Sequence, residues 1–84
     1  MELVLYSKPD CHLCEELKRD LAELQPEFGY TLRERNILDD DALFAQFRDL
    51  IPVLEIDGSR LLYPPHDWQT LHASLRAALL ARSS

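Results

Sequence analysis

The stretch "YSKPDCHLC", residues 6–14, contains both cysteines of the chain, Cys11 and Cys14. An apolar run rich in strand-forming residues, Glu2 to Tyr6, comes directly before it. Pro9 and Asp10 are turn-forming residues that suit the start of a helix. The sequence therefore predicts a strand, a short turn and a helix, with the two cysteines at the junction. The helix is indicated by apolar residues at helical spacing, namely Leu13, Leu17, Leu21 and Leu24.

A Cys-x-x-Cys pair at such a junction suits dithiol chemistry. Residues i and i+3 at a helix start lie on one side of the helix, close enough to form a disulfide. Cys11 falls at the helix start, where unpaired backbone N–H groups and the helix dipole stabilise a thiolate. Cys14 lies one turn further in, so we expect it to be more buried and less ionised. This asymmetry predicts that Cys11 attacks a substrate and that Cys14 resolves the mixed disulfide.

Neighbouring side chains act on the Cys11 thiolate in opposite directions. Lys8 favours the thiolate, whereas the acidic residues Asp10, Glu15 and Glu16 oppose it. We therefore expect a moderately reducing couple rather than a strong oxidant. His12 offers an imidazolium close to the sulfur, although a histidine in the first turn of a helix is expected to point into solvent.

Two other uses of the cysteine pair stay open. A zinc site would need two more ligands, for which the chain offers His12, His66 and His72, but His66 is too distant in sequence for finger-type spacing. Buried cysteines can also serve as small hydrophobic residues. Stapling is a poor explanation, because a disulfide between these neighbours would close a very short loop and remove little entropy from the unfolded chain.

The rest of the chain predicts further elements in a clear order. A charged strand over Tyr30–Ile37 follows the break at Pro26 and Gly29, and its charges suit a sheet edge. A second helix, a hairpin with a turn at residues 57–58, and a last helix capped by Asp67 come next. The apolar faces of these two helices comprise Leu43, Phe44, Phe47 and Leu50, and Trp68, Leu71, Leu75, Ala78 and Leu79.

The resulting order is β-α-β-α-β-β-α, which places the chain in the α/β class. The βαβ start predicts two parallel strands with a right-handed crossover, and the hairpin adds antiparallel strands. We expect a four-stranded mixed sheet with helices on both faces.

Length, composition and net charge limit the domain count, the partners and the location that we expect. The 84 residues predict one domain, residues 1–84, and 46% of them are hydrophobic, so the chain should fold. A net charge of -6 argues against nucleic acid and against an anionic membrane as partners. No apolar stretch is long enough to span a membrane, and the N-terminus lacks the pattern of a signal peptide. We expect a cytoplasmic monomer.

In three landmarks the chain resembles the glutaredoxins of the thioredoxin-fold superfamily. They are the strand followed by Y-S-K-x-x-C-x-x-C at residues 6–14, the step Ile51-Pro52-Val53, which is similar to the family's T-V-P, and the strand end at residues 56–58. The resemblance covers nearly the whole chain. It implies that Cys11 is the nucleophile and Cys14 the resolving thiol. It also implies a cis peptide at Pro52, where the backbone of Ile51 pairs with a peptide-like substrate.

Two departures from the family bear on glutathione. The middle pair of the usual C-P-Y-C is His12-Leu13 here, so the aromatic ring that flanks glutathione is absent. The family's Gly-Gly-x-x-Asp segment is replaced by "LLYPPHD", residues 61–67, in which only Asp67 can stand in for the acidic residue. Its two prolines also remove backbone donors. Glutathione therefore stays open as a reductant.

The sequence thus predicts a thiol-disulfide oxidoreductase that acts on disulfides of proteins or small molecules and requires no metal or organic cofactor. One alternative is a non-catalytic thioredoxin-fold binding module, and another is a metal or iron–sulfur site formed through Cys11. The expected catalytic residues are Cys11 and Cys14, and the expected substrate-binding residues are Lys8, His12, Ile51, Pro52 and Asp67.

Overall fold

The computed structural model describes residues 1–82 and shows the predicted order of strands and helices. A single 3-10 turn, η1, is added before the second helix. The elements are β1 (Glu2–Ser7), α1 (His12–Phe28), β2 (Thr31–Asn36), η1 (Ile37–Asp39), α2 (Asp41–Phe47), β3 (Val53–Ile56), β4 (Arg60–Leu62) and α3 (Trp68–Arg82).

The four strands form one mixed sheet in the order β2-β1-β3-β4. β1 pairs with β2 in parallel, while β3 pairs with β1 and with β4 in antiparallel fashion. The predicted fold class and the edge position of the charged strand are therefore confirmed. Side chains of β2 are almost entirely exposed, as suits an edge strand that carries charges.

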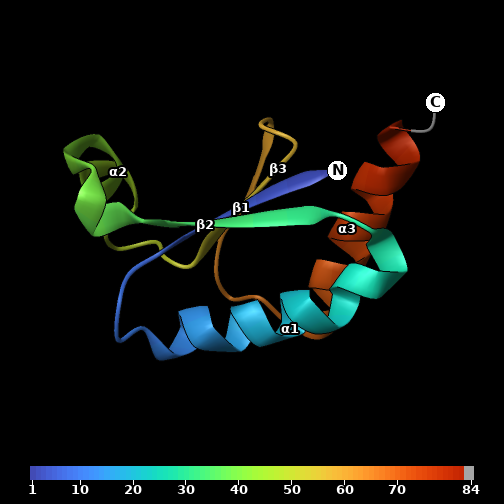
Figure 1. The fold of residues 1–84 in the computed structure, drawn as a ribbon, viewed down its shortest axis with the longest axis horizontal. Coiled ribbons are helices and arrows are strands. Elements are labelled where there is room, and N and C mark those ends of the chain that lie inside the picture. Colours follow the sequence, from blue (N-terminus) through green and yellow to red (C-terminus); the bar gives the residue numbers. More distant parts are fainter. Residues whose placement is uncertain (83–84) are drawn as a thin grey trace.

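Helices cover the two faces of the sheet unequally. α1 runs beneath the sheet, and α3 lies beside the later turns of α1 (Figure 1). α2 lies at the opposite end of the molecule from the C-terminus. The larger core cluster packs α1 and α3 against β1 and β3, and the smaller one packs α2 against the other face. The buried residues of the larger cluster include Leu3, Leu5, Leu17, Leu21, Leu24, Leu54, Ile56, Leu71 and Leu75, and those of the smaller are Tyr6, Ile37, Phe47 and Val53.

The end of α1 differs slightly from its prediction. Pro26 lies inside the last turn, because packing of the buried Phe28 continues the helix beyond the proline. Gly29 then ends it with a φ of 68°, a conformation that glycine adopts without steric cost.

Three residues assigned to the apolar faces of the second and last helices are exposed instead. Phe44 and Leu50 are 39% and 42% exposed, because α2 is only seven residues long and Phe47 alone among its residues is buried. Trp68 is 42% exposed, since the buried stripe of α3 begins one turn later, at Leu71.

One carboxylate joins three elements at the end of β1 that lies away from the cysteines. Asp57, in the β3–β4 turn, accepts a hydrogen bond from the backbone N–H of Glu2 at 2.8 Å. The same oxygen accepts from Arg82 of α3 at 2.9 Å. These partners, the backbone N–H of Glu2 above all, lower the pKa of Asp57.

The buried Tyr30 should make stability sensitive to alkaline pH. Its hydroxyl donates to the backbone carbonyl of Leu21, and burial raises its pKa from 10.0 to about 12. Because the unfolded chain releases this proton first, the free energy of unfolding should fall as pH rises from about 10 towards 12. Tyr30→Phe should remove this part of the pH dependence, and it should lower stability at neutral pH by about 1 kcal/mol.

Urea unfolding at neutral and alkaline pH measures both effects. Tyr63→Phe is the matched control, because Tyr63 is 45% exposed. The same alkaline loss of stability in Tyr30→Phe as in the unaltered protein would contradict this prediction.

Candidate active site

Cys11 occupies the N-terminal cap of α1. β1 ends at Ser7, and the loop turns through Asp10, which has a φ of 59°. Cys11 has an extended backbone, and its Sγ accepts a hydrogen bond from the backbone N–H of Cys14 at 3.2 Å. A sulfur atom thus takes the place usually filled by a serine or aspartate oxygen. At this position the helix terminus favours negative charge on sulfur.

Cys11 and Cys14 form a disulfide, with Cα atoms 5.2 Å apart. Cys14 is 1% exposed, whereas Cys11 is partly exposed. The burial order therefore agrees with the sequence-based expectation. A disulfide substrate in solution can approach Cys11, but the body of α1 and the sheet shield Cys14.

The acidic residues near the cysteines are partly neutralised. Lys18 pairs with Glu15 at 3.0 Å and with Glu34 of β2 at 3.3 Å. The hydrogen bond that Lys18 donates to Glu15 is the main cause that raises the pKa of Lys18. Lys8 is exposed and lies with Lys18 around the same surface hollow. Two lysines thus offset the acidic residues on this side of the site.

His12 points into solvent, as expected from its place in the helix. Its side chain is 82% exposed, and its Nε2 lies 3.1 Å from Glu16, one turn further along α1. Binding of substrate by His12 stays a prediction.

Pro52 faces α1 across a surface groove. The Ile51–Pro52 peptide is cis, as the resemblance implied. The N–H of Ile51 donates to the carbonyl of Phe47 at 3.2 Å, which ties this step to the end of α2. Pro52 is buried and leads into β3, while Ile51 packs against the smaller core cluster. The Ile51–Pro52 peptide is therefore fixed by α2 before it and by β3 after it. Contact of Ile51 with substrate stays a prediction.

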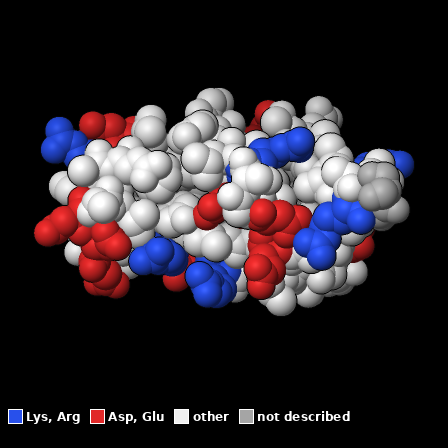
Figure 2. Space-filling model, turned by 90° about the horizontal axis from the view of Figure 1, so that it is seen from above, with Lys and Arg blue, Asp and Glu red and all other residues white. Residues whose placement is uncertain are grey.

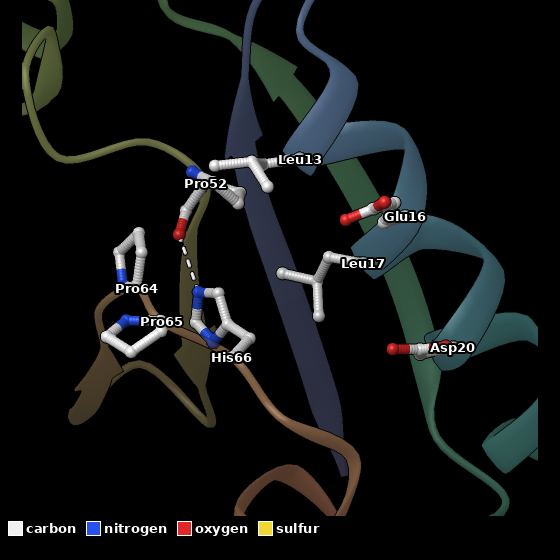
Figure 3. Close-up of a pocket in the computed structure, with 8 residues that line it drawn as sticks. All are labelled: Leu13, Glu16, Leu17, Asp20, Pro52, Pro64, Pro65 and His66. Carbon is white, nitrogen blue, oxygen red and sulfur yellow. Dashed lines mark hydrogen bonds between the residues drawn. The ribbon is translucent and has the colours of Figure 1, made fainter.

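A groove of about 390 Å³ runs between α1 and the Pro52 step. Figure 3 shows the side chains of α1 on one side of it and three residues of the segment after β4 on the other. His66, in that segment, donates from Nε2 to the carbonyl oxygen of Pro52 at 2.7 Å. The groove is lined by Leu13, Glu16, Leu17, Asp20, Pro52, Pro64, Pro65 and His66.

Sequence reasoning missed the place of His66, which it considered only as a zinc ligand. The signal was present in Pro64-Pro65, which interrupt the chain after the hairpin and send it back across the sheet end. The Pro64–Pro65 peptide is also cis. Leu13 was likewise placed on the buried stripe of α1, but it is 56% exposed and lines the groove.

Asp67 serves as a helix cap. One of its oxygens accepts from the N–H of Thr70 at 2.8 Å, and the other accepts from the Thr70 hydroxyl at 2.9 Å. These hydrogen bonds lower the pKa of Asp67. The predicted capping role is therefore present, and a second role in substrate binding stays a prediction.

The histidines considered for zinc lie apart from one another. His12 pairs with Glu16, His66 bonds Pro52, and His72 pairs with Glu27 at 2.7 Å. Within residues 1–82, no three histidine, cysteine, aspartate or glutamate side chains are grouped as metal ligands would be.

Among the same residues, no helix combines the length and the apolar character needed to span a membrane.

The face opposite α1 carries charges of both signs. Figure 2 shows acidic and basic side chains interspersed there, and the described part of this face has no continuous basic patch.

The solved structures that resemble this chain include the following three. Protein XcR50 from X. campestris is 35% identical over 89% of this chain and 96% of its own, with a TM-score of 0.78. Protein Ne2328 from Nitrosomonas europaea is 31% identical over 87% of this chain and 88% of its own, with a TM-score of 0.73. Thioredoxin 1 from Thermosipho africanus is 10% identical over the full length of both chains, with a TM-score of 0.77, and shows the shared fold alone.

The sequence itself matches a described family. Residues 2–79 match the family described as "Glutaredoxin-like domain (DUF836)". None of the curated proteins matches the chain. The family match covers most of the chain and agrees with the strand order, the cis-proline and the Cys-x-x-Cys at the helix start. The chain therefore belongs to the glutaredoxin-like domain family, within the thioredoxin-fold superfamily.

Proposed function

We propose that the protein is a thiol-disulfide oxidoreductase. The Cys11 thiolate attacks one sulfur of a substrate disulfide, and the other sulfur leaves as a thiolate. Cys14 then attacks the Cys11 sulfur and releases the rest of the substrate as a second thiol. The substrate gains two electrons and becomes a dithiol or two thiols, while the Cys11–Cys14 pair gives up two electrons and becomes a disulfide.

One observation carries this proposal: the hydrogen bond from the N–H of Cys14 to the sulfur of Cys11. The donor belongs to the end of α1, so it stabilises a negative sulfur more than a neutral one. The thiolate is both the attacking form and a good leaving group, and one cap therefore serves both directions of the exchange. The burial of Cys14 supports its role as the resolving thiol.

The surroundings support substrate docking beside Cys11. Beside the cis step at Pro52, the backbone of Ile51 pairs with an extended substrate segment through its carbonyl, because its N–H is bonded to Phe47. Lys8 offers a weak electrostatic contribution to the thiolate. The proposed chemistry requires no resident cofactor, and we propose that a cellular thiol reduces the pair again. A cytoplasmic location suits this cycle, because cytosolic thiol pools are kept reduced.

A binding module without catalysis is the rival function. The groove beside the Pro52 step favours it, since such a groove can hold a partner without reaction at Cys11. A reversible redox transition and activity of the cysteine variants separate the two functions.

The Cys11–Cys14 pair should equilibrate with glutathione. We expect a single two-electron transition with a midpoint between roughly -270 and -180 mV, the range of reducing and intermediate couples. Incubation in glutathione redox buffers, an alkylating quench and intact mass would measure it. Cysteines that stayed fully reduced or fully oxidised in every buffer would contradict the prediction.

Substitution of each cysteine should give a different outcome. Cys11→Ser removes the attacking sulfur, so exchange with a disulfide substrate should fall to the uncatalysed rate. Cys14→Ser leaves attack intact but removes resolution, so the mixed disulfide on Cys11 should accumulate and appear as a mass adduct. Circular dichroism checks that both variants fold, and full exchange activity in folded Cys11→Ser would refute the assignment.

A further inference from the structure

The residues that line the groove beside the Pro52 step indicate a class of substrate, which the cysteines alone do not. Leu13, which stands between the two cysteines in the sequence, lies at one end of it, next to Pro52 (Figure 3). The groove therefore begins two residues from Cys11 in the sequence, where a segment of a substrate held on that sulfur can enter it. The inference below rests on the proposed disulfide exchange and concerns its substrate class.

The walls of the groove are mainly apolar. Leu13 is 56% exposed although it sits beside the reactive pair, and the groove continues along Leu17. Pro64 and Pro65 form the opposite wall. Prolines have no backbone N–H, so these two residues offer no main-chain donor to a carboxylate. An apolar side chain of a substrate would be desolvated here at little cost.

The polar part of the lining is acidic. Glu16 and Asp20 lie one helical turn apart on α1, and Figure 3 shows both carboxylates on the groove side. Glu16 contacts only the exposed His12, and Asp20 has no hydrogen-bond or ion-pair partner among residues 1–82. The lining contains no lysine or arginine, and its one imidazole, His66, is bonded to the carbonyl of Pro52.

This charge pattern opposes glutathione and favours a cation. Glutathione carries two carboxylates and one ammonium at neutral pH, so it is a net anion that two acidic side chains would repel. The net charge of -6 acts in the same direction during approach. An exposed ion pair between His12 and Glu16 is weak, so a substrate ammonium or guanidinium can replace it.

We infer that the groove accepts an extended protein segment in which an apolar residue and a lysine or arginine flank the disulfide cysteine. The apolar side chain lies against Leu13 and the two prolines, and the cationic group reaches Glu16 and Asp20. The substrates are therefore basic protein disulfides, and glutathione disulfide is a poor substrate.

Peptide disulfides of opposite charge test this inference. The probes are acetylated, amidated Leu-Cys-Lys and Leu-Cys-Glu, each with a 2-thiopyridyl group on the cysteine sulfur, and the same derivative of glutathione. Attack by the reduced protein at the peptide sulfur breaks the S–S bond and releases pyridine-2-thione, whose absorbance gives the rate. We expect Leu-Cys-Lys to react about three- to tenfold faster than Leu-Cys-Glu, as two exposed ion pairs allow.

Neutral variants locate the source of the preference. Glu16→Gln with Asp20→Asn should bring the rate ratio of the two peptides close to one. Glu23→Gln, an exposed site on the same helix that does not line the groove, should leave the ratio unchanged. The preference of the unaltered protein should also shrink as salt rises, because exposed charges are screened.

The outcomes separate this inference from the proposed function. Equal rates for the two peptides, a faster glutathione probe, or an unchanged ratio in the neutral double variant would overturn the inference while exchange itself proceeds. Failure of every probe to react faster with the unaltered protein than with Cys11→Ser would overturn the proposed function, and the substrate inference with it.

Discussion

Packing of the leucine stripe of α1 against β1 is the constraint on which the site depends. Leu17, Leu21 and Leu24 are buried in one cluster with Leu3 and Leu5 of the strand. This contact fixes the direction of the helix, so its N-terminus lies at the end of β1 and its unpaired N–H groups lie beside Cys11. Hydrophobic burial provides the energy, and the dipole and the free donors at the helix end follow without further cost. The placement of Cys11 at the helix N-terminus is thus a by-product of core packing.

Most of the fold could be predicted from the sequence because its signals are local. The helical spacing of leucines, the turn at residues 57–58 and the charges of Arg33 and Arg35 each determine one element or its place in the sheet. Exposure of Phe44 and Trp68 could not be predicted, since it depends on how far a short helix or a first turn extends over the core. Periodicity predicts which face of a helix is apolar. It does not predict how far the core that packs against this face extends along the helix.

The candidate site also has one part that the sequence predicts and one part that it does not. The cysteines and their unequal burial follow from a motif at a helix start, which sequence alone can locate. The groove depends on contact between the first helix and the segment after the hairpin, which are distant in sequence. His66 therefore became visible only once the structure placed it against the carbonyl of Pro52. Two prolines and this histidine line one side of the groove.

Asp57 gives the architecture a further property. Its carboxylate holds β1, the hairpin turn and α3 together through one oxygen atom, and it lies at the end of β1 opposite the cysteines. The carboxylate that links three elements and the cysteine pair thus lie at opposite ends of a single strand. Changes in the loop around Cys11, or in the groove, would therefore leave the contacts of Asp57 at the far end of β1 intact.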